Sequence, residues 1–144
     1  MTDEGRILAV DPGEKRIGVA LSDPGRRLTK PLTVIRHVSI VEDCRKLAAL
    51  TAENGANLIL IGQALGGDGE ETPQSRHARK IAETLRALTD VPVVLWDESG
   101  TTIDARQNSI QQGVRQKQRR GHLDDRAAAV LLQSYLDRID SAGD

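Results

Sequence analysis

Three acidic positions in this sequence could together bind a divalent metal ion. Asp11 ends the first predicted strand, the pair Asp97 and Glu98 ends the last one, and Asp124 begins the last predicted helix. Carboxylates brought to one edge of a sheet repel one another unless cations lie between them. Mg²⁺ and Mn²⁺ prefer such oxygen ligands, and two of these ions can activate water and stabilise the leaving oxygen in an in-line attack on a phosphodiester. The sequence therefore predicts a site for one or two Mg²⁺ or Mn²⁺ ions.

Only one acid of the pair Asp97 and Glu98 can point into such a site, because successive strand residues face opposite sides of a sheet. Periodicity alone does not select between them. Asp124 lies four residues before Ala128 and shares the helix face that we expect to pack on the sheet, whereas Asp125 is turned away by about 100°. Each acid alone could be an ordinary strand-end or N-cap residue, so the prediction depends on their joint placement.

Basic residues accompany these acids in the sequence. Lys15 and Arg16 come directly after the turn that follows Asp11, and a second run, just before the last predicted helix, contains Arg115, Lys117, Arg119 and Arg120. The 20 Lys+Arg and 21 Asp+Glu leave a net charge of −1, so a nucleic-acid surface must be a local patch. We expect these residues to bind a nucleic-acid backbone, with further cations near the first strands at Arg26, Arg27 and Lys30. A solvated charged surface is the alternative interpretation.

The pattern of apolar residues predicts the elements that position these groups. Three strands joined by short turns form an antiparallel meander, over residues 6–11, 16–22 and 28–36. Helices and buried strands then alternate: helix 39–54, strand 58–61, a helix from Thr72, strand 91–96, helix 101–112 and a helix from Asp124. The order βββαβαβαα predicts an α/β fold with a mixed five-stranded sheet flanked by helices and a site at the carboxyl ends of the strands.

Length and composition limit the class of protein. The 144 residues suit one domain, over 1–144, with flexible polar tails at 1–5 and 141–144. Cys44 is the single cysteine, which excludes a disulfide framework and a cysteine zinc site and favours a core position. No apolar run is long enough to cross a membrane, so we expect a cytoplasmic protein. One Trp, one Tyr and no Phe leave few side chains on which nucleic-acid bases could stack.

A glycine-rich loop, residues 62–69, connects the fourth predicted strand to the next helix. Its backbone N–H groups could bind a phosphate, and a flexible connector beside the site is an equally good interpretation. The loop lacks the Lys-Ser/Thr ending of a nucleotide-binding P-loop. The pattern DxGxxxxG from Asp11 also opens the actin and sugar-kinase fold, but this chain is too short for the second lobe of such an ATPase.

Four segments of the chain carry motifs. The opening segment is Asp11-x-Gly13-x-Lys15-Arg16-Ile17-Gly18-Val19-Ala20, and the central one is Ile61-Gly62-x-x-Leu65-x-x-Asp68-Gly69 followed by Pro73-Gln74. The third is Leu95-Trp96-Asp97-Glu98-x-x-Thr101-Thr102, and the last is Asp124 followed by Ala127-Ala128 and Leu132-Gln133-Ser134-Tyr135-Leu136. These motifs resemble those of the YqgF/RuvX family of small bacterial ribonuclease H-like proteins. Together they are highly specific and cover nearly the whole chain.

This resemblance implies a ribonuclease H-like fold and a metal-dependent nuclease that hydrolyses phosphodiester bonds. It implies that Asp11, Glu98 and Asp124 are the catalytic and metal-binding carboxylates, which selects Glu98 over Asp97. The implied substrate is precursor 16S rRNA, processed at its 5′ end in ribosome biogenesis. Ribosomal particles are then partners, and the protein is a monomer or a homodimer.

Two departures from the family pattern concern substrate binding. Gln63-Ala64 stands where the family usually has Leu-Pro, and Ser99-Gly100 stands where it usually has Arg-Leu. The missing Arg removes a phosphate ligand, and Gly100 loosens the backbone after a catalytic acid. Two other functions stay open. A DNA-junction resolvase would use the same carboxylates and needs a symmetric dimer. The Ser99-Gly100 departure and the small net charge favour a nucleic-acid-binding assembly factor with little catalysis.

Overall fold

A mixed five-stranded sheet forms the centre of the molecule in the computed structural model, which describes residues 4–97 and 124–143. The strands are β1 (Arg6–Pro12), β2 (Arg16–Ser22), β3 (Thr29–Arg36), β4 (Ala56–Gln63) and β5 (Val93–Asp97). Their order across the sheet is β3-β2-β1-β4-β5. β1, β2 and β3 pair antiparallel, whereas β4 pairs parallel with β1 and β5 pairs parallel with β4. The predicted meander and the predicted mixed sheet are both confirmed.

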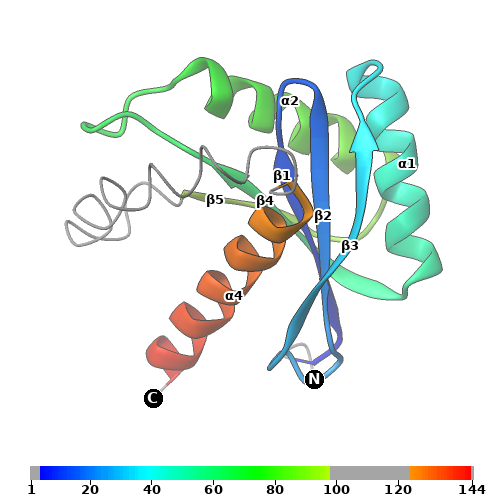
Figure 1. Ribbon diagram of the computed structural model, residues 1–144, viewed down its shortest axis with the longest axis vertical. Helices are drawn as coiled ribbons and strands as arrows, with labels where there is room; N and C mark the ends of the chain where they lie inside the picture. Colours follow the sequence, from blue (N-terminus) through cyan, green and yellow to red (C-terminus); the bar gives the residue numbers. More distant parts are fainter. Residues whose placement is uncertain (1–3, 98–123, 144) are drawn as a thin grey trace.

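Helices cover both faces of this sheet (Figure 1). α1 (Ile40–Glu53) and α2 (Pro73–Leu88) pack against one face, and α4 (Asp124–Gly143) packs against the other. The expected start of the last helix at Asp124 is confirmed. The helix predicted over residues 101–112 lies outside the described residues.

Two short polar motifs begin the first two helices, as the sequence predicts. The Ser39 side chain accepts a hydrogen bond from the backbone N–H of Glu42, at 3.1 Å. Thr72 accepts one from the N–H of Ser75, at 3.0 Å, and the Ser75 hydroxyl contacts the Thr72 backbone in return. Pro73 follows at the first helical position, where its missing N–H costs nothing. Local sequence alone therefore determines where α1 and α2 begin.

Alternation along the strands divides the buried side chains into two cores. In β1, Leu8 and Val10 are fully buried toward α1 and α2, whereas Ile7 and Ala9 are fully buried beneath α4. The α4 side of that second core consists of Ala128, Leu131, Leu132 and Leu136. Each fully buried Leu or Ile stabilises the fold by about 1.5–3 kcal/mol. The same alternation therefore determines which face of the sheet each strand-end residue occupies.

Cys44 of α1 lies in the core shared with α2, as predicted. Its thiol contacts the carbonyl oxygen of Ile81 at 3.6 Å. Burial raises the pKa of this thiol to about 11, and the neighbouring Asp43 adds to the shift. Cys44 is therefore a structural residue with no tendency to form a reactive thiolate.

The described N-terminal end of the chain makes hydrogen bonds with distant residues, and the last helix continues close to the C-terminal end. The N–H of Gly5 donates to the carbonyl of Pro24 at 2.8 Å, and the Asn57 side chain donates to the carbonyl of Glu4 at 2.6 Å. α4 continues as far as Gly143. The expectation of flexible tails stays a prediction for the ends of the chain. Residues 1–3 and 144 lie outside the described part.

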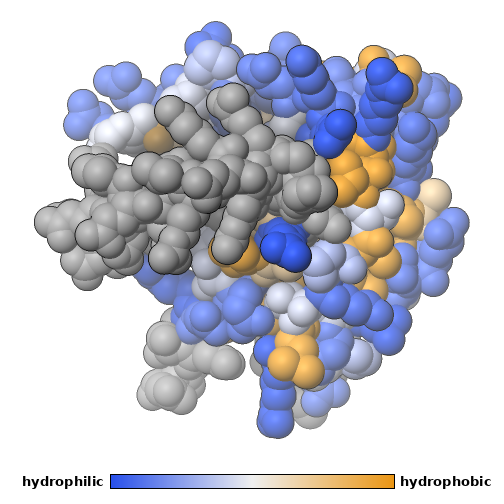
Figure 2. Space-filling view, in the orientation of Figure 1, coloured by the Kyte–Doolittle hydropathy of each residue, from blue (hydrophilic) through white to orange (hydrophobic). Residues whose placement is uncertain are grey.

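The outer surface is largely hydrophilic on the face that carries α4. Figure 2 shows its exposed hydrophobic side chains as small patches between hydrophilic ones. Val34, Val38 and Val41 are among the exposed hydrophobic residues of the chain. Within residues 4–97 and 124–143, no helix combines the length and the hydrophobicity needed to cross a membrane.

Candidate active site

Asp11 lies near the end of β1, on the face of the sheet that α4 covers. It follows Ile7 and Ala9 in the strand alternation, and both of these residues are buried beneath α4. Asp11 itself is half-buried, and its partner in the β1–β2 register is Gly18. Because Gly18 has no side chain, β2 places no side-chain bulk directly beside this carboxylate.

The turn that follows Asp11 is fixed by backbone hydrogen bonds. The N–H of Gly13 donates to the carbonyl of Arg16 at 3.0 Å, and the N–H of His37 donates to the carbonyl of Lys15 at 2.8 Å. A Cβ atom at Gly13 would lie only 2.4 Å from the Arg16 carbonyl oxygen. The turn therefore requires glycine at position 13, and its contact with the end of β3 holds the hairpin in place.

Asp97, one of the two acids at the end of β5, occupies the opposite face of the sheet from Asp11. Val93 and Leu95 pack into the core beneath α1 and α2, whereas Trp96 packs beneath α4. Strand alternation then assigns Asp97 to the face of α1 and α2. Its Oδ1 accepts a hydrogen bond from the N–H of Leu65 at 3.3 Å. Asp97 therefore connects the end of β5 to the glycine-rich loop.

Trp96 fills space at the edge of the α4 core. It is partly buried, and its ring meets that of Tyr135 edge to face, with 5.7 Å between ring centroids. This contact joins β5 to α4 and supports the assignment of Trp96 to the α4 face.

The start of α4 is the second element of the site. α4 begins over β1 and β2, toward the turn between them, and runs away from that turn (Figure 1). Ala128 and Leu131 are almost completely buried against the sheet. A Cβ atom at Gly62 of β4 would lie 2.8 Å from Leu131 Cδ2, so the glycine allows the helix to approach the sheet closely. Position 124 lies one helical turn before Ala128, on the sheet-facing side of the helix.

The predicted metal ligands are described to different extents. Asp11 is described with its side chain, α4 begins at Asp124, and Glu98 lies outside the described residues. In the part of the chain that the structure describes, no three His, Cys, Asp or Glu side chains form a group that could hold a metal ion. Asp11 places a carboxylate at the end of β1, and oxygen ligands of this kind suit a hard ion such as Mg²⁺.

The cations predicted to bind nucleic acid lie in separate parts of the chain. Arg16 is exposed on the α4 face, two residues along β2 from Gly18. Lys15 is exposed in the adjoining turn, whereas the basic run containing Arg115, Lys117, Arg119 and Arg120 lies outside the described residues.

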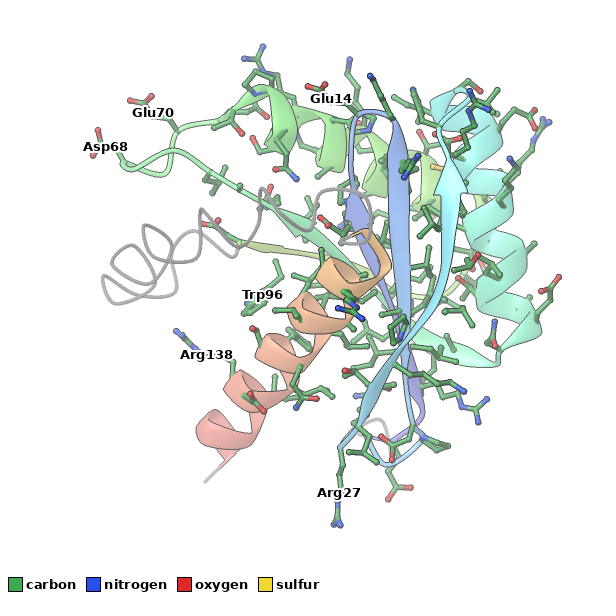
Figure 3. The ribbon with its side chains drawn as sticks, viewed as in Figure 1. Glu14, Arg27, Asp68, Glu70, Trp96 and Arg138 are labelled. Carbon is green, nitrogen blue, oxygen red and sulfur yellow. The ribbon has the colours of Figure 1, made fainter. Side chains whose placement is uncertain are left out.

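Three further cations, expected near the first strands, lie at the other end of the sheet. Arg26 and Arg27 occupy the turn between β2 and β3, and Lys30 pairs with Leu21 near that turn. Figure 3 shows Arg27 and Glu14 at opposite ends of the sheet. These cations are therefore remote from Asp11, because adjacent hairpin turns of a meander alternate between the two ends of the sheet.

Sequence reasoning missed one cation close to the site. Arg36 ends β3 and is the register partner of Arg16 in β2. Both residues are exposed, and cross-strand partners share a face of the sheet. The position of Arg36 beside Arg16 depends on the register of β2 with β3, and this register includes an irregularity between Val19 and Ala20 that local sequence does not show.

Hydrogen bonds within the protein occupy several N–H groups of the glycine-rich loop. The Ala64 N–H donates to Gln74 Oε1 at 2.6 Å, and the Leu65 N–H donates to Asp97. The N–H groups of Gly66 and Gly69 donate to backbone carbonyls at 2.7 and 2.9 Å. These contacts disfavour a phosphate cradle and indicate a connector that is tied to α2 and β5.

A buried ionisable pair stabilises the same end of the sheet from the other face. Asp43 is completely buried and pairs with Nδ1 of His37, and it also accepts a hydrogen bond from the N–H of Val38 at 3.0 Å. The His37 ring meets that of His77 edge to face at 5.8 Å. Burial, together with the nearby His37, lowers the pKa of His77.

Two solved structures share this fold. The *Thermus thermophilus* RuvC in complex with a Holliday junction substrate aligns with a TM-score of 0.57 at 11% identity, covering 94% of this chain and 96% of that one. The fowlpox virus resolvase in complex with Holliday junction DNA aligns with a TM-score of 0.52 at 17% identity, covering 93% and 98%. The chain therefore has the ribonuclease H-like fold of these resolvases, as predicted.

Sequence comparison gives the family. The family model RuvX, described as Holliday junction resolvase, matches residues 5–138. A relative from *Roseiflexus* sp. named as a pre-16S rRNA nuclease is 37% identical over 136 residues, covering 94% of this chain and 96% of the relative. Another with the same name, from *Anaeromyxobacter* sp., is 40% identical over 132 residues, covering 92% and 96%. The chain belongs to the RuvX family.

Proposed function

We propose that this protein is a metal-dependent nuclease that hydrolyses phosphodiester bonds in precursor 16S rRNA during ribosome biogenesis. The observation that carries the proposal is the placement of Asp11. This carboxylate ends a buried strand on the α4 face, opposite a glycine and near the start of a helix that begins with Asp124. Membership of the RuvX family and relatives named as pre-16S rRNA nucleases support the same activity.

Asp11, Glu98 and Asp124 would hold one or two Mg²⁺ or Mn²⁺ ions. Strand alternation supports Glu98 over Asp97, because Trp96 lies on the α4 face and Asp97 on the other. Helical periodicity supports Asp124 over Asp125, because only Asp124 lies one turn before the buried Ala128. The bound ions would supply a nucleophile from water and stabilise the leaving oxygen.

The chain's other residues would bind and orient the substrate. Arg16 shares the α4 face with Asp11 and would neutralise a phosphate near the reacting one. Lys15 and the run containing Arg115, Lys117, Arg119 and Arg120 would extend this contact along the backbone. Gly18 leaves space beside Asp11 in which the phosphodiester could lie. We place the protein in the cytoplasm, where precursor rRNA and ribosomal particles would be its partners.

A DNA-junction resolvase is the second candidate, because the matching family model is described as Holliday junction resolvase. The same carboxylates could hydrolyse either nucleic acid. Resolution of a junction needs two symmetric cuts, so this candidate requires a homodimer.

Incubation of the purified protein with a precursor 16S rRNA fragment and with a four-way DNA junction tests the proposal. Each substrate is supplied with Mg²⁺, with Mn²⁺ and with EDTA. We expect metal-dependent cleavage of the RNA near the mature 5′ end and none in EDTA. Preferred cleavage of the junction by a dimer would favour the second candidate. Binding without metal-dependent cleavage of either substrate would contradict the nuclease and favour an assembly factor.

A further inference from the structure

We propose that Asp43 and His37 are positioning residues for substrate binding. They fix the turn between β1 and β2 and thereby preorganise Lys15, a residue of the proposed nucleic-acid contact. This role rests on the proposed function, because Lys15 binds a phosphodiester backbone only in that function. Both residues act through the backbone of the turn rather than on the substrate.

Backbone hydrogen bonds hold the turn on both sides of Lys15. The N–H of Gly13 donates to the carbonyl of Arg16 at 3.0 Å and closes the turn. The carbonyl of Lys15 accepts a hydrogen bond from the N–H of His37 at 2.8 Å, directly after the end of β3. The side chains of Glu14 and Lys15 are exposed. The contact with His37 therefore ties an exposed turn to the edge of the sheet.

The Asp43 carboxylate holds the chain where it leaves β3, and it uses both oxygens. Oδ2 pairs with Nδ1 of His37, and Oδ1 accepts a hydrogen bond from the N–H of Val38 at 3.0 Å. Asp43 is completely buried in α1, where its own N–H donates to the carbonyl of Ser39 at 2.8 Å. Hydrogen bonds to a charged acceptor are stronger than neutral ones, and burial strengthens them further. The N–H of His37 is therefore fixed relative to α1.

A ring of α2 packs against the same histidine. His77 meets His37 edge to face, with 5.8 Å between ring centroids. Nε2 of His77 is buried and has no hydrogen-bond partner among the described residues, and burial lowers the pKa of His77, so this ring is neutral at pH 7. The charged groups that act on it are His37, Asp43, Lys80 and Glu14. Glu14 belongs to the turn (Figure 3), so both helices support His37 close to the turn that it holds.

A turn that is fixed in advance should strengthen substrate binding, because a mobile turn has to be ordered at the moment of binding. Ordering the backbone of one residue weakens binding by about 5- to 30-fold. Loss of the Asp43–His37 pair should therefore raise Kd and KM. The value of kcat should change little, because the sheet itself keeps Asp11 in register with Gly18.

Fluorescence anisotropy of a labelled single-stranded RNA, in EDTA and 0.1 M salt, measures Kd without cleavage. We expect His37→Ala to raise Kd about 5- to 30-fold. His37→Asn should restore most of the affinity, because the Asn amide can donate to Asp43 from the position of Nδ1. Leu47→Ala is the matched control: Leu47 is fully buried one turn after Asp43 in α1, so its loss destabilises the fold without touching the turn, and Kd should stay that of the parent.

A double-mutant cycle with Lys15→Ala separates positioning from a purely structural role. Lys15→Ala alone should raise Kd about 5-fold at this salt concentration, the loss of one phosphate contact. If His37 acts through Lys15, the double variant should bind nearly as well as the weaker single variant, well short of the product of the two losses. Steady-state cleavage with Mg²⁺ should show the effect of His37→Ala in KM, whereas a smaller folded fraction would lower the apparent kcat instead.

A folded His37→Ala protein with the parent's affinity would overturn the inference, as would an equal loss in Leu47→Ala or losses that multiply in the cycle. A His37→Asn protein that binds as weakly as His37→Ala would also overturn it. If His37→Ala does not fold, Asp43→Asn replaces it, and Kd should again rise. A parent protein that binds RNA and responds to these variants but cleaves nothing would contradict the proposed nuclease while supporting the positioning of Lys15.

Discussion

Replacement of Asp43 should destabilise the fold far more than replacement of a neighbouring surface acid. The Asp43 carboxylate is completely buried, pairs with Nδ1 of His37 and accepts a hydrogen bond from the N–H of Val38. Hydrogen bonds to a charged group contribute about 1.5–3 kcal/mol each. His37 is partly exposed and can regain water, so we expect Asp43→Ala to lower the free energy of unfolding by about 2–4 kcal/mol.

For a chain of this length, that loss corresponds to a decrease in Tm of about 6–15 °C. Asp43→Asn keeps the shape and the oxygen that faces Val38 but removes the charge, so its loss should be about half as large. Urea unfolding followed by circular dichroism and by the fluorescence of Trp96, the single tryptophan, gives the free energies. Trp96 lies in the α4 core, on the other face, so coincident transitions would show that the sheet unfolds as one unit.

Glu42→Ala is the matched control, because Glu42 lies in the same first turn of α1 and pairs with Arg45 at the surface. Exposed ion pairs contribute about 0–1 kcal/mol, so this variant should stay within that range of the parent. A loss at Asp43→Ala no larger than that at Glu42→Ala would refute the reasoning, since it would mean that the buried pair contributes nothing to stability.

Three further changes test other parts of the account. His77 has a pKa below its ordinary value of about 6.5, so the unfolded chain binds more protons than the folded one and stability should fall as the pH drops below about 6.5. His77→Leu should make the free energy of unfolding, measured in urea from pH 8 to pH 5, fall less steeply with pH. An unchanged pH dependence would contradict the assignment. Gly13→Ala places a Cβ atom 2.4 Å from a backbone oxygen and should cost about 1–3 kcal/mol together with most of the cleavage. Gly25→Ala, in the other hairpin turn, meets only the Asp23 side chain at 3.2 Å, so it should cost less stability and retain cleavage. Asp124→Asn should reduce metal binding more than Asp125→Asn does, as measured by titration calorimetry. A larger loss at Asp125 would mean that a different face of α4 is turned toward the metal site.

Much of the fold follows from local sequence. Ser39 and Thr72 begin helices because their side chains satisfy N–H groups a few residues away, and such contacts need no knowledge of the rest of the chain. The apolar run in β4 and the pattern of apolar residues in β1 likewise indicate which of their side chains are buried. The position of Asp11 at the end of a buried strand was therefore predictable from residues close to it in the sequence.

The remaining features depend on partners that are distant in sequence. The face of Asp97 follows from how β5 packs, and the hydrogen bond that it accepts comes from a loop 32 residues earlier. Asp43 looks like an ordinary acid in the first turn of a helix. Its partner His37 is only six residues away, but the complete burial of Asp43 depends on how α1 packs in the folded chain. Arg36 approaches Arg16 through the register of β2 with β3, which a register irregularity shifts. Local sequence patterns therefore do not predict these contacts.

Cleavage of a precursor 16S rRNA fragment by Asp11→Asn and by Asp97→Asn, compared at equal concentration with Mg²⁺ or Mn²⁺, tests the central claim most directly. The account predicts that Asp11→Asn abolishes cleavage while the protein stays folded and binds RNA in EDTA as the parent does. Asp97→Asn keeps an oxygen that can accept the Leu65 N–H and lies on the other face, so it should cleave within a few-fold of the parent. Cleavage by Asp11→Asn within a few-fold of the parent, or its loss in Asp97→Asn alone, would contradict the account.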